Sequence, residues 1–432
     1  MMDSAFAEVP GYRRILGRLS PAALLRQFGS EYWTFFAAAF LFDLGFGLFF
    51  FLFNLYLTDL HFDERAVGRI TACLTLGNVA GTIPATILAR RFGLRPLLLL
   101  CFVCAPIFSA VRLVASGESG QIVIALVTGA VLCCWPICFS PTIAALTNDR
   151  NRTRGFSIMF ATGIGVGTLS GAMGGYVPEL LHEGRLHTPV VAGIGIVLLI
   201  ACGLVVMGAW PILKLRLTQR LPPRGHRSRV FHPFLRRFLP PFLLWNVVTG
   251  SFPAFGAIYL QQVLKISLGR IGLVFSASQL MEFVAVIASP ALIRRAGLTR
   301  GIAISLFGTA IALAMIGITR QATVAVGLYV VYYALMFMCE PGIYNLLMDR
   351  IPEEERSTAS AVQNLSGALC QAATAAATGS CIVRFGYGAV LFSNAVAAVS
   401  AALLFLALAT RAASNTMRAS PDSLHEAPQS TL

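Results

Sequence analysis

Residues 66–96 read AVGRITACLTLGNVAGTIPATILARRFGLRP, an apolar span that stops at a group of arginines around Gly93. A second apolar span begins near Gly269 and stops in the same way around Gly297. At offsets of 204, 203 and 200 residues the coinciding pairs include Gly68 and Gly272, Arg90 and Arg294, Arg91 and Arg295, Asp43 and Asn246, and Asp149 and Asp349. Self-similarity over this distance predicts that the chain is two copies of one structural unit.

The composition indicates a membrane protein. Hydrophobic residues make up 56% of the chain and charged residues 12%, whereas soluble domains contain about 45–50% apolar and roughly 25% charged residues. The first 32 residues are polar and basic. The first apolar span is too long for a signal peptide, so we expect it to be retained. The 432 residues suit about a dozen helices of ~20 residues.

The predicted fold is all-α, because backbone groups in lipid need partners within the protein. We expect two six-helix bundles related by pseudo-two-fold symmetry, with twelve transmembrane helices. The expected spans are 33–57, 66–89, 95–114, 121–146, 155–181, 188–213, 238–261, 269–293, 299–319, 322–347, 358–383 and 389–410. The expected segments are a cytoplasmic N-terminal segment 1–32, a first half 33–213, a basic cytoplasmic linker 214–237, a second half 238–410 and a disordered cytoplasmic tail 411–432.

The net charge of +14 follows the pattern of a membrane topology. With the N-terminus in the cytoplasm, 25 of the 33 Lys and Arg residues fall on the cytoplasmic side. This bias predicts a multi-pass protein of the cell membrane, the inner membrane in a bacterium, with both termini in the cytoplasm. The same bias explains the basic charge without a nucleic-acid partner.

The sequence lacks the residues that an ATP-driven pump, an enzyme or a metal site would require. Neither Lys214 nor Lys265 follows a glycine, which excludes the phosphate-binding loop of an ATP-driven pump. The six histidines lie in loops or tails, so no catalytic cluster is expected and the protein is not predicted to be an enzyme. Cys101 and Cys104 have metal-ligand spacing, but no His or carboxylate accompanies them, which favours a packing role. No metal and no cofactor are predicted.

These features resemble the major facilitator superfamily over roughly 33–410: two six-helix halves, a long basic middle loop, and a basic turn with a glycine after the second and eighth helices. The family motif is G-x-x-x-D-R-x-G-R-K, and the aligned run here is TILARRFGLR, Thr86 to Arg95. The acid of the motif is replaced by arginine in both halves, so the family's gating contact through that acid is left unsupported. By resemblance, the gating-turn residues are Arg90, Arg91, Gly93, Arg95, Arg294, Arg295 and Gly297.

A glycine stripe runs along the fifth span and partly resembles the glycine-rich fifth helix of antiporters in this superfamily. Its members recur every fourth residue: Gly163, Gly167, Gly171 and Gly175. Glycine at this spacing lets another helix approach closely. The eleventh span carries a similar stripe: Ala368, Ala372, Ala376 and Ser380. We expect the two stripes to carry the contact between the halves; tight packing within one half is the alternative.

Three acids lie inside the predicted spans: Asp43, Glu282 and Glu340. Charges in lipid are costly, so each is a functional candidate. The repeat places neutral polar residues opposite them: Asn246, Asn78 and Ser140. Hydrogen bonding alone therefore does not require an acid at these positions. A carboxyl held away from bulk water can exchange protons near neutral pH, so we predict proton coupling at all three. A protonated acid that serves only in packing is the alternative.

Helical spacing and the resemblance suggest a substrate site. On the tenth span Tyr333, Phe337, Glu340 and Tyr344 form one stripe. In the superfamily, helices one, four, seven and ten line the central cavity. The predicted substrate-binding residues are therefore Asp43, Asn54, Asn246, Tyr333, Phe337, Glu340 and Tyr344. An aromatic cavity with one or two acids suits a lipophilic cation or a neutral molecule; contact of the rings with lipid is the alternative.

We therefore predict a secondary active transporter that works by alternating access. The expected activity is proton-coupled efflux (antiport) of a small organic molecule, lipophilic or cationic. The expected partners are this substrate, protons and the lipid bilayer, and a monomer is expected. Proton-linked uptake (symport) of a metabolite would use the same acids, and a non-transporting membrane sensor is an alternative of another class. The span 121–146 has no basic residue, so the arginine motif of the family's fourth helix is missing.

Overall fold

The computed structural model describes residues 27–148, 150–183, 189–217 and 233–418, and over these residues it is helical, without β-strands. The helices of the first half are α3 (Ser30–Asp59), α4 (Glu64–Phe92), α5 (Leu94–Val114), α6 (Glu118–Leu132), α7 (Cys134–Leu146), α8 (Arg152–Glu183) and α9 (Val190–Lys214). Those of the second half are α10 (Pro233–Gly250), η1 (Phe252–Ala254), α11 (Gly256–Gln262), α12 (Leu268–Ala296), α13 (Leu298–Ile318), α14 (Ala322–Met338), α15 (Glu340–Arg350) and α16 (Glu353–Arg418).

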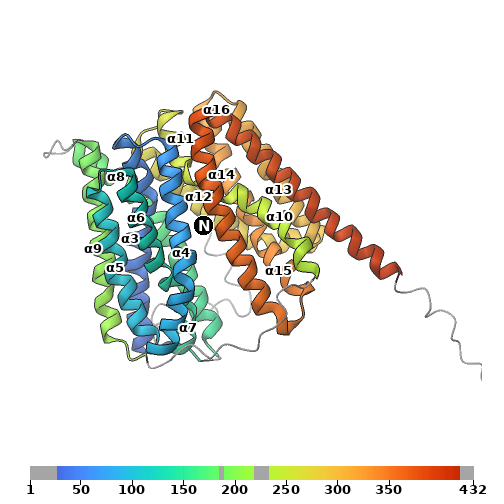
Figure 1. The fold of residues 1–432 in the computed structure, drawn as a ribbon, viewed down its shortest axis with the longest axis horizontal. Helices are drawn as coiled ribbons and strands as arrows, with labels where there is room; N and C mark the ends of the chain where they lie inside the picture. The colour runs from blue at the N-terminus through green and yellow to red at the C-terminus, as the bar shows by residue number, and fades with distance from the viewer. Residues whose placement is uncertain (1–26, 149, 184–188, 218–232, 419–432) are drawn as a thin grey trace, which may run out of the picture.

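Twelve membrane spans can be counted in the described residues. Ten helical segments are long and apolar enough to cross a membrane, and the bent pair Pro233–Ala254 with Gly256–Gln262 makes an eleventh. The run α16 contains one non-helical residue, Gly386, with φ 78° and ψ 171°. Gly386 divides α16 into two arms that diverge from a common turn (Figure 1), and this division gives the twelfth span. The predicted all-α fold is thus confirmed.

The two halves lie side by side, with α3 to α9 in one bundle and α10 to α16 in the other (Figure 1). Each half has a tight turn between its second and third spans, at Gly93 in the first half and Gly297 in the second. Their φ angles are 92° and 86°. L-residues with a side chain rarely adopt this region. The repeat therefore conserves the two glycines for a backbone reason.

Three spans are broken within their length. The helix of the fourth span has a one-residue break at Cys133, between α6 and α7, and that of the tenth span has one at Cys339, between α14 and α15. The seventh span consists of α10, η1 and α11, with Pro253 inside η1. Proline cannot donate a backbone hydrogen bond, which explains the break at Pro253. These are spans that the family resemblance assigns to the central cavity.

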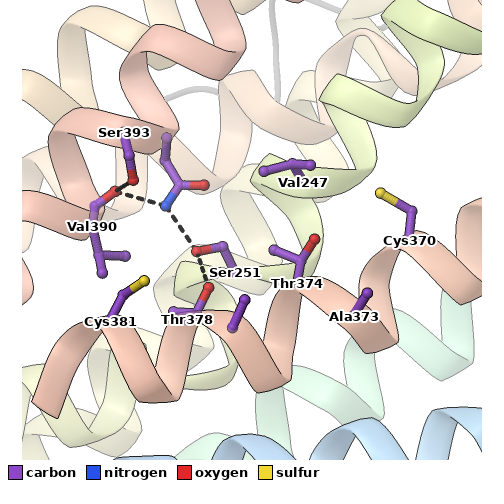
Figure 2. A pocket seen from close by; sticks show the side chains of 11 residues that line it. Val247, Ser251, Cys370, Ala373, Thr374, Thr378, Cys381, Val390 and Ser393 are labelled. Carbon is purple, nitrogen blue, oxygen red and sulfur yellow. Dashed lines mark hydrogen bonds between the residues drawn. The ribbon is translucent and has the colours of Figure 1, made fainter. Parts of the chain in front are cut away.

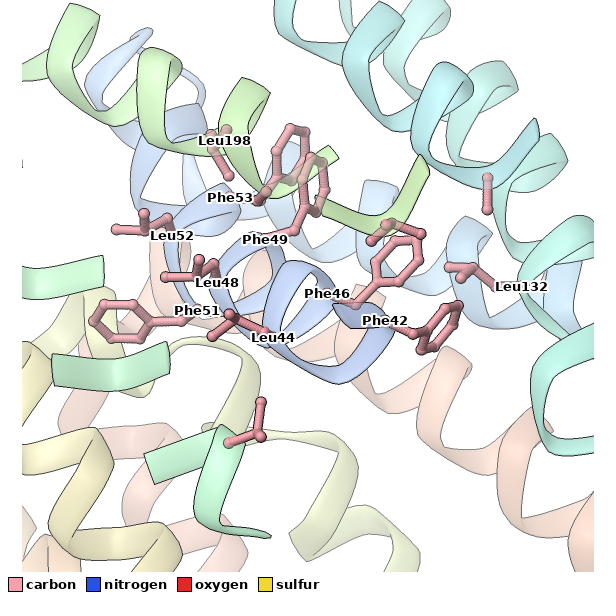
Figure 3. Close-up of a cluster of buried hydrophobic side chains, with 14 of the residues drawn as sticks. Phe42, Leu44, Phe46, Leu48, Phe49, Phe51, Leu52, Phe53, Leu132 and Leu198 are labelled. Atoms are coloured by element: carbon pink, nitrogen blue, oxygen red, sulfur yellow. The ribbon is translucent and has the colours of Figure 1, made fainter. Parts of the chain in front are cut away.

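The first span forms the centre of the first bundle. Large apolar side chains leave α3 in several directions, with Phe42 and Phe46 on one side and Phe51 on the opposite side (Figure 3). Its aromatic rings stack along the helix; those of Phe49 and Phe53 lie 4.8 Å apart at an interplanar angle of 13°. A helix that is apolar all round is buried by its neighbours, so α3 is a fixed support for the residues it carries.

The halves meet through two helix pairs, α8 with α12 and α4 with the first arm of α16. At Gly175 a Cβ atom would lie 2.9 Å from the Cα of Gly272, and at Gly68 it would lie 3.3 Å from the Cα of Gly379. Such separations leave no room for a side chain. Three members of the glycine stripe, Gly167, Gly171 and Gly175, therefore pack against α12 of the other half, whereas the contact of the eleventh span is made by residues outside its predicted stripe. In α16 the residues against α4 are Ala375 and Gly379, one position before two members of the predicted set.

Hydrogen bonds between the halves lie toward the same end as these contacts. Glu179 in α8 accepts from the backbone N–H of Gly269 at 2.8 Å. Asn54 donates to the carbonyl of Ala254 at 2.9 Å, and Tyr387 donates to Glu64 at 3.4 Å. All of these residues lie at the ends of their helices that are remote from Gly93 and Gly297. We call the end with these two glycine turns the basic end; the halves are joined at the opposite end.

The expected extramembrane segments lie largely outside the described residues. The described part begins at residue 27, and residues 218–232 of the expected linker are not described. Residues 411–418 belong to the second arm of α16 rather than to a disordered tail. Residues 419–432 lie outside the described residues.

Exchange of two glycines of α8 for alanine should have opposite effects on stability. Alanine is favoured over glycine in a helix by about 1 kcal/mol, and a Cβ at Gly165 would meet nothing within 4 Å. Gly165→Ala should therefore raise the midpoint of thermal unfolding of the purified protein. In Gly175→Ala the new methyl meets backbone atoms of α12, and overpacking of this kind costs roughly 1–3 kcal/mol. The midpoint should fall.

Equal shifts of the two midpoints would contradict a backbone contact between the halves at Gly175. Because both changes are made in the same helix with the same residues, helix propensity cancels in the comparison.

Candidate functional site

Asp43 opens on a cavity of about 470 Å³ between α3, α7 and α8. Asp43 is the only ionisable side chain among the lining residues, and six of the other lining side chains are aromatic: Phe42, Phe46, Phe50, Trp135, Phe139 and Phe160. Among the described residues the carboxyl has neither an ion pair nor a hydrogen bond. A single carboxyl is therefore available to a ligand inside an aromatic enclosure.

The shape of this cavity depends on small residues of α8. A Cβ atom at Gly163 would lie 3.3 Å from the Oδ2 atom of Asp43, so the glycine leaves room for the carboxyl. A larger side chain at Gly163 would occupy the space beside the carboxyl. Gly163, a member of the predicted packing stripe, thus lies against the first half's own acid, while Gly167, Gly171 and Gly175 approach residues of α12.

The aromatic rings around Asp43 hold one another in place. The ring of Trp135 stacks on that of Phe42 at 4.2 Å and an interplanar angle of 24°. The ring of Phe46 stacks on that of Phe50 at 5.6 Å and 26°. Aromatic faces carry partial negative charge and attract organic cations. Rings and carboxylate together can bind a flat or bulky cation, or a neutral aromatic molecule by stacking.

A second cavity of about 640 Å³ continues from this site toward the basic end. It lies between α8 and α12 and shares Phe160 and Ile164 with the Asp43 cavity. Its wall includes Phe283 and Ile287 from the second half. The two cavities thus have a common wall, and the second one is formed by both halves. Together they follow α8 from its N-terminal turn to Asp43.

The acids of the second half form a separate group. The carboxyls of Glu282 in α12 and Glu340 in α15 are close enough to interact electrostatically. Tyr333 interacts in the same way with Glu282, and Tyr344 with Glu340. The ring of Phe337 lies 6.0 Å from that of Tyr333. The structure therefore brings together four predicted substrate residues and two of the three predicted proton-coupling acids.

Two predicted substrate residues lie elsewhere. Asn54 donates to the carbonyl of Ala254 at the junction of the halves. Asn246 is 2% exposed, donates to the carbonyl of Phe242 and accepts a hydrogen bond from Gln371 at 3.0 Å. Both amides are used in contacts between helices. Asn54 and Asn246 line none of the described cavities.

No described cavity holds all three acids. The connection between Asp43 and the second half runs through Gln279, one turn before Glu282 in α12. A Cβ atom at Gly167, which lines the Asp43 cavity, would lie 3.0 Å from the Nε2 atom of Gln279. Gln279 lies three residues before Glu282 and so shares a helix face with it. This spacing could have identified Gln279 as a candidate site residue from the sequence. Trp135, Phe139 and Phe160 had no comparable signal.

Within the part of the chain that the structure describes, no ion pair involves the arginines of the basic turns. Within the described residues the one ion pair joins Arg69 and Glu118 at 3.0 Å, at the other end of α4. Arg95 donates to the carbonyl of Leu213 in its own half, and Arg91 lies over the ring of Phe92 at 5.3 Å. Arg90, Arg294 and Arg295 lie in the last turns of α4 and α12. A gating role for these turns stays a prediction.

Metal ligands do not cluster in the described residues: no group of three or more His, Cys, Asp or Glu side chains is placed to hold one ion. Cys101 is fully buried in the hydrophobic core of the first half.

Solved structures of transporters share the fold. A nucleoside transporter, NupG, superposes with a TM-score of 0.71 at 14% identity, covering 88% of this chain and 99% of its own. A bacterial homologue of the human lysosomal transporter Spinster, inward-facing and occupied, gives 0.70 at 14%, with 93% and 98% covered. A D-xylose-proton symporter gives 0.70 at 14%, with 87% and 96% covered. At these identities the similarity shows the fold alone.

No curated protein matches the sequence. The model of the Major Facilitator Superfamily, however, matches residues 35–375, most of both bundles. The apolar spans and this match identify a multi-pass membrane protein with the fold of a transporter. The chain belongs to the major facilitator superfamily.

Proposed function

We propose that this protein is a secondary active transporter that exports a small lipophilic or cationic organic molecule in exchange for protons. The observation that carries the proposal is the Asp43 cavity, where one carboxyl without a partner among the described residues is lined by six aromatic rings. A charge at membrane depth without a partner is costly. Its presence is explained if a proton or a cationic substrate neutralises it during the transport cycle.

Exchange follows from the use of one carboxyl for both ligands. A protonated Asp43 no longer attracts a cation, and a bound cation favours the ionised carboxylate. Proton and substrate therefore compete for the same group, and each must leave before the other binds. A carrier that changes its access between these two events exports one ligand while it imports the other.

The joint between the halves supports alternating access. The contacts of α8 with α12 and of α4 with α16 lie at the end remote from the basic turns, while the larger cavity lies toward the basic end. Under the positive-inside rule the basic end is cytoplasmic. In this conformation the Asp43 cavity would then be reached from the cytoplasm, which suits the loading of an exported substrate.

The pair Glu282 and Glu340 is proposed as the second proton site. Two neighbouring carboxyls repel each other when both are ionised, and protonation of one of them relieves this repulsion. Gln279 lies beside Gly167 of the Asp43 cavity and one turn before Glu282 in α12, so movement of α12 would link the two sites.

Uptake driven by proton entry would use the same residues, and the fold is shared with a D-xylose-proton symporter. Proteoliposomes with an imposed pH gradient distinguish the two directions. With ethidium as the probe cation, export by exchange predicts that ethidium moves against the proton flow. Movement with the proton flow would favour symport, and no protein-dependent movement of any tested cation or neutral metabolite would favour a sensor.

Asp43→Asn should abolish the coupling. The amide keeps the size of the side chain but can neither bind a proton nor attract a cation. Flux of ethidium driven by a pH gradient in proteoliposomes should fall by about tenfold or more, as expected when one partner of a desolvated charge pair is removed. The matched control is Asp59→Asn in the last turn of the same helix, which should transport normally. Unaltered coupled flux in Asp43→Asn would remove Asp43 from the mechanism.

Glu282→Gln and Glu340→Gln should have non-additive effects on the same flux. If the two carboxyls take up one proton as a unit, either change disrupts that unit, and the second change has little left to remove. The double variant should therefore resemble the more impaired single variant. The control is the double variant Glu282→Gln with Glu118→Gln, because Glu118 lies in the first half and pairs with Arg69. The effects of these two changes should add. Multiplicative loss in the Glu282 and Glu340 double variant would show that the two acids act independently.

A further inference from the structure

A third cavity, of about 340 Å³, lies entirely within the second half. It is lined by α10 and the two arms of α16 and shares no lining residue with the cavities around Asp43 (Figure 2). The proposed transport cycle therefore makes no use of it. Ser251 follows directly after α10 and reaches this cavity between the two arms of α16.

Three buried polar side chains line the inner wall of the cavity. Asn394 is 3% exposed, Ser251 1% and Thr378 6%. The Nδ2 atom of Asn394 donates to the Oγ atom of Ser251 at 2.8 Å and to the carbonyl of Val390 at 2.8 Å. The hydroxyls of Ser251 and Thr378 are 2.8 Å apart. The dashed lines of Figure 2 follow this network.

In this network one hydrogen-bond acceptor and one hydrogen-bond donor have no partner among the described residues. The bond to the Val390 carbonyl fixes the amide orientation of Asn394, because only the nitrogen can donate to a carbonyl. The Oδ1 atom of Asn394 is then buried with no donor among the described residues. Ser251 and Thr378 share a single hydrogen bond, so one of their two hydroxyl hydrogens has no acceptor there. Buried polar groups are normally paired.

The rest of the lining combines apolar side chains with the hydroxyls of Thr374 and Ser393, and the cavity opens outward. Its walls include Val247 and Val390, and its mouth is formed by Ala373, Ala377 and Cys381 on the first arm of α16. These three residues are exposed. The face of the arm that touches α4 carries Ala375 and Gly379 instead. Because the arm is a membrane span, the mouth faces the bilayer.

We propose that this cavity binds a membrane-dissolved alcohol, an amphipathic molecule with one hydroxyl and an apolar chain. A hydroxyl donates one hydrogen bond and accepts another, so it satisfies the Oδ1 atom of Asn394 and the free Ser251 or Thr378 hydrogen together. An ammonium group has no acceptor and a carboxylate has no donor, so each would leave one group unpaired. The apolar chain occupies the groove between Val247, Ala377 and Val390.

The site lies within the membrane-spanning part of the second half. Val390 and Asn394 follow the Gly386 turn by four and eight residues, which places them roughly 6 and 12 Å along the helix from that turn. A ligand can therefore enter laterally from the lipid without passing through the central cavity.

Photolabelling of the full chain in phosphatidylcholine vesicles tests the proposal. The probe is a long-chain alcohol with a diazirine in its chain, and the labelled peptide is identified by mass spectrometry. Label is expected on the segment from Cys370 to Cys381. Unlabelled 1-octanol should compete, and octyl methyl ether, which accepts but cannot donate, should compete about fivefold more weakly because one hydrogen bond is lost.

Ala377→Phe fills the mouth from an exposed position without altering the polar network, and it should remove the label from this segment. Val396→Phe, on an exposed surface of the second arm, is the matched control and should leave labelling unchanged. Equal competition by the alcohol and the ether would overturn the proposal, since it would mean that lipid contact or a bound water explains the site. Undiminished labelling of Ala377→Phe would overturn it as well.

Discussion

The arrangement of this protein depends on the direct approach of backbone to backbone between its two halves. At Gly175 and Gly272, and again at Gly68 and Gly379, the helices come too close for any side chain. These contacts lie at one end of the bundles, so they join the halves there and leave the basic end separate. The position of the Asp43 cavity and of the adjoining cavity relative to the joint follows from this constraint.

The joint also explains why the chemistry is divided between the halves. The first half contributes the lone carboxyl of Asp43 and its aromatic rings, and the second half contributes the pair Glu282 and Glu340. The repeat partner of Asp43 is Asn246, which is committed to hydrogen bonds with α10 and Gln371. At this repeated position Asn246 therefore supports packing in the second half, and Asp43 in the first half is available for a ligand.

The fold could be predicted from the sequence because a repeat, apolar spans and basic turns are strong signals. The site was predicted in part: the three acids lie at membrane depth, but Asn54 and Asn246 serve packing, and Trp135 and Phe160 were missed. Helical spacing tells which residues share a face, but not which neighbour covers that face. The direction of each face is set by long-range packing, such as the fit of Gly163 to the Asp43 carboxyl, which a single sequence does not reveal.

The breaks in the fourth, seventh and tenth spans have a mechanical consequence. A continuous helix moves as one rod, whereas the one-residue breaks at Cys133 and Cys339 interrupt the helical hydrogen bonding at a single point in each span. The segments α7 and α15, both at the basic end, can then tilt inward while α6 and α14 keep their packing. In the proposed cycle, a small substrate would then be occluded by movement of these short segments at the membrane surface, while the contacts at the glycines stay in place.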